Sequence, residues 1–434
     1  MDTAGIVKVS EIADFLKEIL KIPSIGDKET EVAEKVIEVL EREGITTYEL
    51  IESEPGRGNL LIKIKGREEK GRKLMIIGHS DVVPAGEGWS VDPFKGVEKD
   101  GYIYGRGAID NKGQVAVMTY LAILLKRLGN PFRGELRLLI AADEEKQDPN
   151  HGVRFLIRNR RDIFSDIDGA IGELGGMVEL SEKKRQLIVI GEKGATALEI
   201  VFRGKSGHSS ISYNSSNPID YMIKFLNNVP NSVFFISKPV KEIFNQLLGL
   251  KSMFITNKLL NKLVLAKIRK SNPLLAQAIH ALTHVTITKT KVNGGMADNV
   301  IPDEVKVTVN ARIFPEQRLE DIISLIKRYS NGIPNVKIIP KAWIPATYSE
   351  TDTELFRACV KTVKEMNYEP LIFFNTGSSD SSWLRSLGIP VYHVFTTKSP
   401  IEVYRIHGTD ERIHEEDLIN ALIGYYKLVK NFLR

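Results

Sequence analysis

Polar side chains capable of metal-binding and acid–base chemistry follow two apolar segments of the chain. "IIGHSDVVP" places His79 and Asp81 two residues apart, so both side chains leave an extended chain on the same side. "LRLLIAADEEKQ" ends in three consecutive acids, and its strand neighbours Glu144 and Glu145 are expected to point in opposite directions. Crowded carboxylates raise one another's pKa unless a positive charge lies among them. A ring of Arg and Lys, or a metal ion, is therefore expected here.

Three further segments place candidate ligands in short loops. "GRGAIDNKG" holds Asp110 in a turn before a predicted helix, "AIGELGG" presents Glu173 between glycines, and "YRIHGTDERI" offers His407 before the last helix. Two imidazoles and several carboxylates suit zinc or a similar divalent ion. Two such ions that share a bridging carboxylate form a hydrolytic arrangement. Because no Arg or Lys cluster adjoins these loops, metal is favoured over a basic ring.

Composition indicates an ordinary globular protein. The 434 residues are 42% apolar and 26% charged, and this length predicts two domains. The net charge of +5 is too small to indicate a nucleic-acid partner. A single cysteine, Cys359, excludes an internal disulfide and a cysteine-rich metal site. No signal peptide is recognisable and the longest apolar run, 115–125, is too short to span a bilayer, so we expect a soluble cytoplasmic protein without a membrane partner.

The elements that must position the candidate ligands alternate between helix and strand. Strands are predicted at "NLLIKIKG", "KLMIIGH", "ELRLLIAA" and "DIDGAIGE", and a buried helix at "KGQVAVMTYLAILLKRLG". This order predicts an α/β domain with a mixed, mostly parallel sheet flanked by helices. Ligands bind such sheets at the carboxyl ends of the strands, where the candidate ligands lie.

The pattern changes after about residue 194. "ALEIVFRG" and "EVKVTVNAR" alternate apolar and polar residues, which predicts half-buried strands of an antiparallel sheet, and a basic, apolar helical stretch lies between them near 241–282. The last third returns to the α/β pattern. We therefore expect a catalytic domain in two parts, 1–193 and 313–434, with an α+β domain inserted at 194–312.

The ordered motifs resemble those of the dizinc amidohydrolase and peptidase family that includes aminoacylase, acetylornithine deacetylase, succinyl-diaminopimelate desuccinylase and glutamate carboxypeptidase. The motifs are "GHSDVVPAG…W…DPF", "GRGAIDNKG", "ADEE", "GE", "GKSGHSS", "ADNVIP", "GSSD" and "HGTDE", and they cover nearly the whole chain. The resemblance implies a zinc-peptidase-like catalytic domain whose inserted domain acts as a lid and forms a homodimer.

The resemblance also implies a role for each candidate ligand. It assigns His79 and Glu173 to one metal, Glu145 and His407 to the other, and Asp110 to a bridge between them. The two ions would be zinc, although cobalt and manganese suit the same ligands.

Two acids are given other tasks by the resemblance. Asp81 would orient the imidazole of His79, and Glu144 would be the general base that activates the bridging water.

In the inserted domain, the resemblance makes His208 a residue that reaches the partner's active site and steadies the oxyanion. The positions that hold substrate in relatives are matched by Asn299, by Arg312 and by the loop Gly377, Ser378, Ser379 and Asp380. The alternatives are a capped turn for His208, a rim salt bridge for Arg312, and a helix cap for Ser379. The basic segment near 250–270 is read as a solvated face of a lid helix rather than as a site for an anionic partner.

The expected activity is metal-dependent hydrolysis of the amide bond of N-acyl amino acids or short peptides, of the deacylase or carboxypeptidase type. Glu173, rather than aspartate, favours this type in the resemblance. The alternatives are an aminopeptidase or dipeptidase of the same family and, from another class, a non-catalytic binding protein on this fold. The acyl group is not readable from the sequence.

Overall fold

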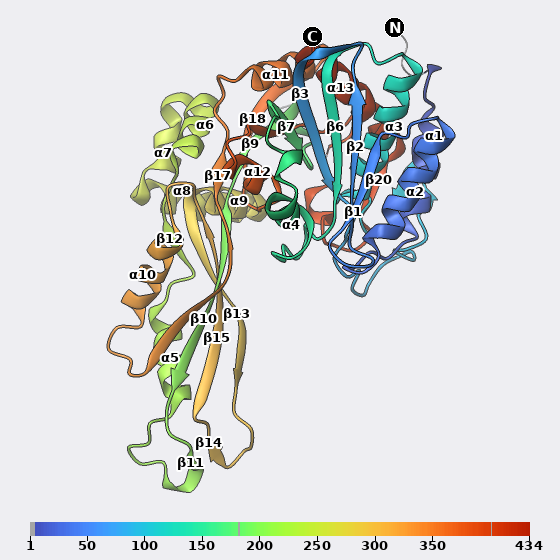
Figure 1. The fold of residues 1–434 in the computed structure, drawn as a ribbon. Coiled ribbons are helices and arrows are strands. Elements are labelled where there is room, and N and C mark those ends of the chain that lie inside the picture. Colours follow the sequence, from blue (N-terminus) through green and yellow to red (C-terminus); the bar gives the residue numbers. More distant parts are fainter. Residues whose placement is uncertain (1–4, 181–182, 401) are drawn as a thin grey trace. The chain divides into compact units, whose positions relative to one another are not determined.

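The computed structural model describes residues 5–180, 183–400 and 402–434, and the chain divides into two compact units (Figure 1). The first unit comprises Met1–Ile190, Ser349–Phe373 and Ser379–Arg434. The second unit comprises Gly191–Tyr348 and Phe374–Ser378.

The observed units differ from the expected domains at the end of the inserted domain and at Phe374–Ser378, which was expected in the catalytic domain but belongs to the second unit. The expected start of the inserted domain at 194 is close to the observed start at Gly191. Its expected end at 312 lies inside the second unit, which continues to Tyr348. The physical reason is strand β16 (Val336–Ile344), which pairs along β10 (Gly194–Arg203) and so belongs to the same sheet.

The first unit is built around a mixed sheet with the order β1-β2-β6-β3-β7-β19-β9, and β8 and β18 also pair with β9 (Figure 1). Its strands are β1 Tyr48–Glu52, β2 Gly58–Lys65, β3 Glu68–His79, β6 Arg133–Ala141, β7 Gly169–Gly172, β8 Met177–Leu180, β9 Lys183–Glu192, β18 Glu369–Asn375 and β19 Val391–His393. A small sheet contains β4 Val97–Lys99, β5 Tyr102–Tyr104 and β20 Arg412–His414.

The expected mixed sheet flanked by helices is confirmed, and its parallel part is confined to the centre. Strands β6, β3, β7 and β19 run parallel to their neighbours within this group, whereas β1, β2 and β9 are joined in antiparallel fashion. The apolar strand residues are buried on both faces of these central strands, as expected for parallel strands covered by helices.

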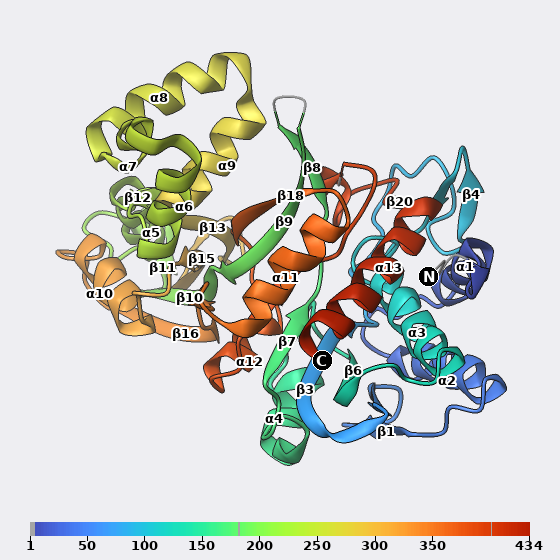
Figure 2. The same cartoon turned by 90° about the horizontal axis from the view of Figure 1, so that it is seen from above.

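Helices cover both faces of this sheet (Figure 2). One face carries α1, α2, α3 and α13, and the opposite face packs α4, η2 and α12 against alternate residues of β3 and β6. The helices of the first unit are α1 Val9–Leu20, α2 Glu29–Arg42, α3 Lys112–Arg127, α4 Gly152–Asn159, η2 Arg161–Ile163, α11 Glu354–Glu365, α12 Ser381–Ser386, η5 Val403–Arg405 and α13 Glu415–Phe432.

The second unit contains an antiparallel sheet with the order β12-β13-β15-β10-β16. The alternating apolar residues meet across the central pair, where Leu198 lies opposite Val309 and Ile200 opposite Val307. The other strands are β11 Gly207–His208, β12 Ser232–Phe234, β13 His284–Gly294, β14 Val300–Ile301, β15 Glu304–Ile313 and β17 Thr347–Tyr348. The predicted antiparallel sheet is therefore present.

Helices make up the rest of the second unit, and α6 to α9 form one packed group in the predicted helical stretch (Figure 2). The helices are η3 Ser209–Ile211, α5 Pro218–Asn228, α6 Lys238–Leu248, η4 Gly249–Ser252, α7 Met253–Thr256, α8 Lys258–Ser271, α9 Pro273–Thr283 and α10 Leu319–Tyr329. Among the helices that the structure describes, none has the length and apolar character needed to cross a membrane.

Candidate metal centre

The predicted ligands meet at one edge of the first unit's sheet. Strand β3 ends at His79, and Glu173 directly follows β7. Glu144 lies in the turn that follows β6. Because β6, β3 and β7 run parallel, their carboxyl ends lie at the same edge, where α/β sheets bind ligands. Two loops complete the set, with Asp110 just before α3 and His407 between η5 and β20.

The buried imidazole of His79 contacts carboxylates through both ring nitrogens. Its Nε2 lies 2.9 Å from Oδ1 of Asp110 and 3.0 Å from Oε2 of Glu173. Its Nδ1 lies 3.4 Å from Oδ1 of Asp81 and 3.1 Å from the Asp81 backbone oxygen. A metal-binding imidazole needs an acceptor on its second nitrogen to fix the ring. The geometry therefore turns Nε2 toward the ligand cluster and Nδ1 toward Asp81.

Asp110 lies between the two histidines and presents a different carboxylate oxygen to each. Oδ1 is 2.9 Å from Nε2 of His79, and Oδ2 is 3.4 Å from Nε2 of His407. His407 Nε2 is also 3.0 Å from Oε1 of Glu145. Two ligand groups, His79 with Glu173 and His407 with Glu145, therefore share Asp110. This is the arrangement of a carboxylate that bridges two cations.

Asp81 fixes more than the histidine ring. Its Oδ1 accepts a hydrogen bond from the backbone N–H of Glu144, and its Oδ2 accepts one from the N–H of Glu145, each at 3.0 Å. One buried carboxylate thus ties the end of β3 to the turn that carries both glutamates.

The three consecutive acids at 143–145 do not share one environment. Asp143 has a φ of 62° and forms a buried ion pair with Arg57. Because β6 has already ended at Ala141, Glu144 and Glu145 lie in a turn rather than on a strand. The expectation that they are neighbours on a strand is therefore wrong, and each belongs to a different group of candidate ligands.

The pKa shifts of the cluster show an excess of buried negative charge. Burial lowers the pKa of His79, but the charge of Glu173 and the hydrogen bond to Asp110 raise it well above its usual range. Hydrogen bonds to two carboxylates raise the pKa of His407 to about 10. Burial raises the pKa of Glu173 to about 7, and burial together with the charge of Glu173 raises that of Glu144. Crowded carboxylates explain these directions, because their negative charge raises the pKa of nearby histidines and glutamates alike.

The donor set fits divalent metal ions. The acidic cluster consists of Asp81, Asp110, Glu144, Glu145 and Glu173. Within the described part of the chain, no Lys or Arg forms an ion pair with these five groups, because the nearby Arg57 is paired with Asp143 and Glu29. Imidazole nitrogens and carboxylate oxygens without thiolates match zinc and similar ions. The predicted choice of metal over a basic ring therefore agrees with the described contacts.

The carboxylate of Glu144 borders the ligand cluster, but it lies farther from the imidazole of His79 than the carboxylates of Asp110 and Glu173 do. Its Oε2 lies 4.0 Å from Nε2 of His79, about 1 Å farther than the oxygens of Asp110 and Glu173. Its Oε1 accepts a hydrogen bond of 3.2 Å from the Gln147 side chain. A carboxylate beside a metal centre with a raised pKa has the properties of a proton acceptor.

Glu411 is a buried residue of this site to which the sequence assigned no role. Its Oε1 accepts hydrogen bonds from the N–H groups of Ile109 and Asp110 at 2.8 and 2.9 Å. Its Oε2 accepts from the N–H of Gly107 at 3.1 Å and from Arg106 at 2.7 Å. Glu411 therefore holds the loop that presents Asp110. The only signal in the sequence is its place in "HGTDE", four residues after His407.

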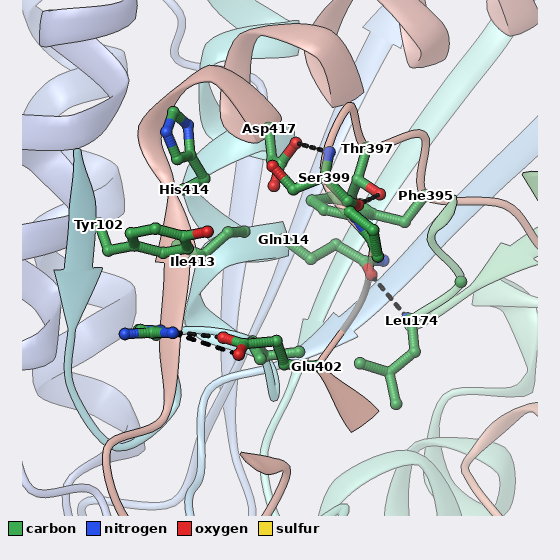
Figure 3. A pocket seen from close by; sticks show the side chains of 14 residues that line it. Tyr102, Gln114, Leu174, Phe395, Thr397, Ser399, Glu402, Ile413, His414 and Asp417 are labelled. Atoms are coloured by element: carbon green, nitrogen blue, oxygen red, sulfur yellow. Dashed lines mark hydrogen bonds and ion pairs between the residues drawn. The ribbon is translucent and has the colours of Figure 1, made fainter. Parts of the chain in front are cut away.

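Gln114 is a second positioning residue that was missed. Its Nε2 donates to the backbone oxygen of Ile77 at 2.9 Å, and its Oε1 accepts from the N–H of Leu174 at 3.2 Å (Figure 3). It thus links the ends of β3 and β7, which carry His79 and Glu173. An amide side chain at the start of the mostly apolar helix "QVAVMTYLAILL" is the signal that could have found it.

A mainly apolar cavity of about 40 Å³ lies beside these loops (Figure 3). Leu174 and Ile109, each adjacent to a predicted metal ligand, belong to its lining, together with Tyr102 and Phe395. None of the predicted metal ligands lines it. The cavity therefore lies behind the ligand loops and is not the place where the ligand atoms converge.

Asp380 adds a further buried carboxyl group near the site. Burial and the charge of Glu173 raise its pKa well above the usual range. Its Oδ2 has no hydrogen-bond partner among the described residues. Asp380 ends the "GSSD" loop, which the resemblance matched to positions that hold substrate in relatives, and that role stays a prediction.

The second unit, described by itself, brings its predicted site residues into two places. Exposed His208 accepts a hydrogen bond at Nδ1 from the N–H of Ser210, the contact expected for a capped turn. Ser209 donates its N–H to the backbone oxygen of Asn299 at 2.9 Å, and His208 pairs with Val300, so Asn299 directly precedes the strand that pairs with His208. A role of either in binding substrate stays a prediction.

Arg312 and the loop at 377–379 provide the other place. Nη1 of Arg312 donates to Oγ of Ser378 at 2.9 Å, and the N–H of Gly377 donates to the Asn375 side chain at 3.1 Å. Ser379 belongs to the first unit, where its Oγ accepts the N–H of Ser381 at the start of α12. This contact matches the helix-cap alternative for Ser379.

Comparisons with known proteins agree with this geometry. The profile of Peptidase family M20/M25/M40 matches residues 75–431. The N-fatty-acyl-amino acid synthase/hydrolase PM20D1 of Xenopus tropicalis is 26% identical over 459 residues, covering 97% of this chain and 86% of that protein. Succinyl-diaminopimelate desuccinylase of Wolinella succinogenes is 27% identical over 405 residues, covering 93% of this chain and 94% of that protein.

The fold is also shared with a solved structure. The M20 family metallo-carboxypeptidase Sso-CP2 from Sulfolobus solfataricus superposes with a TM-score of 0.76 at 20% identity. The match covers 97% of this chain and 99% of that chain.

Proposed function

The chain belongs to Peptidase family M20/M25/M40 and is a metal-dependent hydrolase, and from this premise we propose that it cleaves the amide bond of N-acyl amino acids or short peptides. The observation that carries the proposal is the Asp110 carboxylate, which presents one oxygen to each of two histidines. This supports a centre for two divalent ions, which we take to be zinc. His79 and Glu173 would hold one ion, Glu145 and His407 the other, and Asp110 both.

Two divalent ions in this centre would lower the pKa of a bound water to about 7 and polarise the substrate carbonyl. Glu144 accepts the proton that leaves the attacking water and then donates it to the departing amine nitrogen, so the proton count balances. Asp81 keeps Nε2 of His79 turned toward the cluster by accepting from Nδ1. Gln114 and Glu411 hold the loops that carry the ligands.

The second unit is proposed to bind substrate and to act as a lid and dimerisation domain. The guanidinium of Arg312, held by Ser378, can bind a substrate carboxylate through two parallel hydrogen bonds. We assign Gly377, Ser378 and Ser379 to substrate binding together with Arg312. We propose that Asn299, which lies near His208, also binds substrate, and that His208 stabilises the oxyanion from the partner chain of a homodimer.

The names of the relatives support the acyl or peptide substrate class. One relative is named for N-fatty-acyl-amino acids, one for a succinyl group on diaminopimelate, and the structural relative is called a carboxypeptidase. A panel of N-acyl amino acids with short and long acyl chains, C-terminal peptides and dipeptides with a free amino group separates these activities. Cleavage confined to substrates with a free amino group would refute the deacylase or carboxypeptidase assignment.

The decisive variant is Glu144→Gln, which removes the proton acceptor but keeps the size of the side chain. We expect about two metal ions per chain in both proteins and a loss of about 100- to 10,000-fold in kcat for the variant. The exposed Glu365→Gln serves as a control, because this glutamate lies on α11 away from the cluster. Full activity of Glu144→Gln with normal metal content would show that another group is the base.

A further inference from the structure

The helical group α6–α9 of the second unit exposes an unusual amount of apolar surface. Of the fifteen large apolar side chains that are exposed among the described residues, nine lie in this group. They are Leu247, Leu248, Leu250, Met253, Phe254, Leu259, Leu263, Leu274 and Leu275. Single exposed leucines are common, but concentrated ones mark an interaction surface.

The same helical group is strongly basic and carries a single acid, Glu242 near the start of α6. Residues 243–297 contain no Asp or Glu. The exposed basic side chains between 243 and 283 are Lys251, Lys258, Lys262, Lys267, Arg269 and Lys270. Within the described part of the chain, none of these six forms an ion pair with an acidic side chain. Their charge is therefore available to an anionic partner.

Helix α8 arranges both properties along one face. Leu259, Leu263 and Ala266 recur at intervals of four and three residues, so they line one side of the helix, and all three are exposed. Leu259 is 78% exposed and Leu263 is 68% exposed. At helical spacing, Lys262 lies beside this apolar line, and Lys270 lies on it, about one turn after Ala266. The face therefore combines an apolar centre with a basic border.

The orientation of α8 is fixed from its opposite side. Asn261 is buried, and its Nδ2 donates to the backbone oxygen of Ile255 at 2.8 Å and to Oγ1 of Thr283 at 3.4 Å. These bonds join α8 to α7 and to the end of α9. The leucine face consequently points away from the helices that α8 packs against.

An anionic lipid surface matches this combination of properties. Leucines at the acyl boundary with lysines at the headgroups are typical of helices that lie in a membrane interface. A nucleic acid would use the positive charge but leave the leucines in water. A second copy of the same face would bring like charges together. With 14 residues, α8 is about 21 Å long, too short to span a bilayer but suited to lie on one.

We propose that the helical group α6–α9 docks the second unit on an anionic lipid surface, with Leu259 and Leu263 inserted and the lysines at the headgroups. This interaction is additional to the proposed hydrolysis and does not rest on it. It also replaces the sequence expectation of a solvated basic face and no membrane partner, because the sequence did not reveal that the leucines are exposed.

The test is sedimentation of the full chain with phosphatidylcholine vesicles, with and without phosphatidylglycerol. We expect binding only to the anionic vesicles and weaker binding at high salt, because salt screens the headgroup charge. The pair Leu259→Ser and Leu263→Ser should lower the partition constant about tenfold per leucine. The pair Lys262→Glu and Lys270→Glu should lower it at least about fivefold per lysine.

Matched controls lie in the same unit but outside the helical group. Met296→Ser replaces another highly exposed apolar side chain, and Lys327→Glu reverses a charge on α10. Both should bind vesicles like the unchanged protein, and all variants should keep its circular dichroism and solution hydrolysis. Equal losses from the controls would overturn the assignment of the surface.

Three other results would also overturn the proposal. One is failure of the unchanged protein to bind anionic vesicles at low salt. Another is equal binding to heparin and to vesicles, with both reduced by the lysine substitutions but not by the leucine substitutions. This result would indicate a general polyanion site. The third is a protein that does not bind vesicles and runs as a dimer in gel filtration, with the dimer lost when both leucines are substituted. This result would indicate that a second copy of the chain covers the face.

Discussion

Glu411 provides a sharp test of how the candidate centre is held together. It is buried, and its two oxygens accept four hydrogen bonds, from Arg106 and from the backbone N–H groups of Gly107, Ile109 and Asp110. Glu411→Gln keeps the size of the side chain and removes its charge. The new NH₂ group must face donors whichever way the amide turns, because donors surround both oxygens.

The expected loss follows from these contacts. Leaving a buried donor without an acceptor costs about 1–3 kcal/mol, and removing one partner of a buried ion pair costs about 3–5 kcal/mol. Because the Arg106 pair and the backbone bonds share the same carboxylate, these values overlap, and we expect the free energy of unfolding to fall by about 4 kcal/mol. Loss of the anchor beside Asp110 should also weaken metal binding by about 10- to 100-fold.

Urea unfolding followed by fluorescence and metal titration against a competing chelator measure the two effects. Glu416→Gln is the control, because this exposed glutamate on α13 forms an ion pair with exposed Lys398 at 3.3 Å, and loss of such a surface pair should cost less than about 1 kcal/mol. If Glu411→Gln unfolds at the same urea concentration as the unchanged protein and binds metal equally well, the positioning role of Glu411 is refuted.

Two further predictions concern other buried groups. Asp81→Asn should lower metal affinity about 10- to 100-fold, because the amide has one acceptor oxygen where the carboxylate has two, and these contact both glutamate N–H groups and Nδ1 of His79; unchanged affinity in a chelator titration would contradict this. Burial lowers the pKa of Lys193 to about 7 from its usual value of 10.5. Between these two pH values the unfolded chain binds about one more proton than the folded chain. The free energy of unfolding therefore rises with pH across that window, by up to about 1.4 kcal/mol per pH unit. In Lys193→Met this part of the rise should be absent from the pH dependence of thermal unfolding, and an identical slope in both proteins would exclude Lys193 as its source.

Local patterns were sufficient for much of the fold. The alternation at "ALEIVFRG" and "EVKVTVNAR" predicted strands whose apolar residues meet across β10 and β15. The sequence also placed every predicted metal ligand at a strand end or in a short loop, and these positions lie at one edge of the sheet in the structure. These features depend on residue periodicity and turn residues, which neighbouring positions in the chain specify.

The domain boundary at 312 could not be found in the same way. After β15 the chain forms α10 and then β16, and nothing in the local pattern assigns β16 to one sheet or the other. Its membership in the second unit depends on pairing with β10, more than a hundred residues earlier. Pairing over such a separation is decided by which edge is free in the folded chain.

Helix α8 shows the same limit for a surface. The spacing of Leu259 and Leu263 is that of a helix that buries its apolar face, and the sequence alone does not show which face is covered. The contacts of Asn261 with α7 and α9 decide this, and they leave the leucines exposed. The consequence for a lipid surface became visible only in the folded unit.

The sequence by itself determined which side chains take part in the candidate centre, because two imidazoles and several carboxylates at strand ends are a property of residue type and order. Only the tertiary structure decided how they face one another: one oxygen of Asp110 toward each histidine, Asp81 behind His79, and Glu411 holding the Asp110 loop. These contacts join segments up to about three hundred residues apart. Apart from the His79–Asp81 pair, which one short segment contains, their geometry depends on the packing of the whole unit, because no local segment contains both partners.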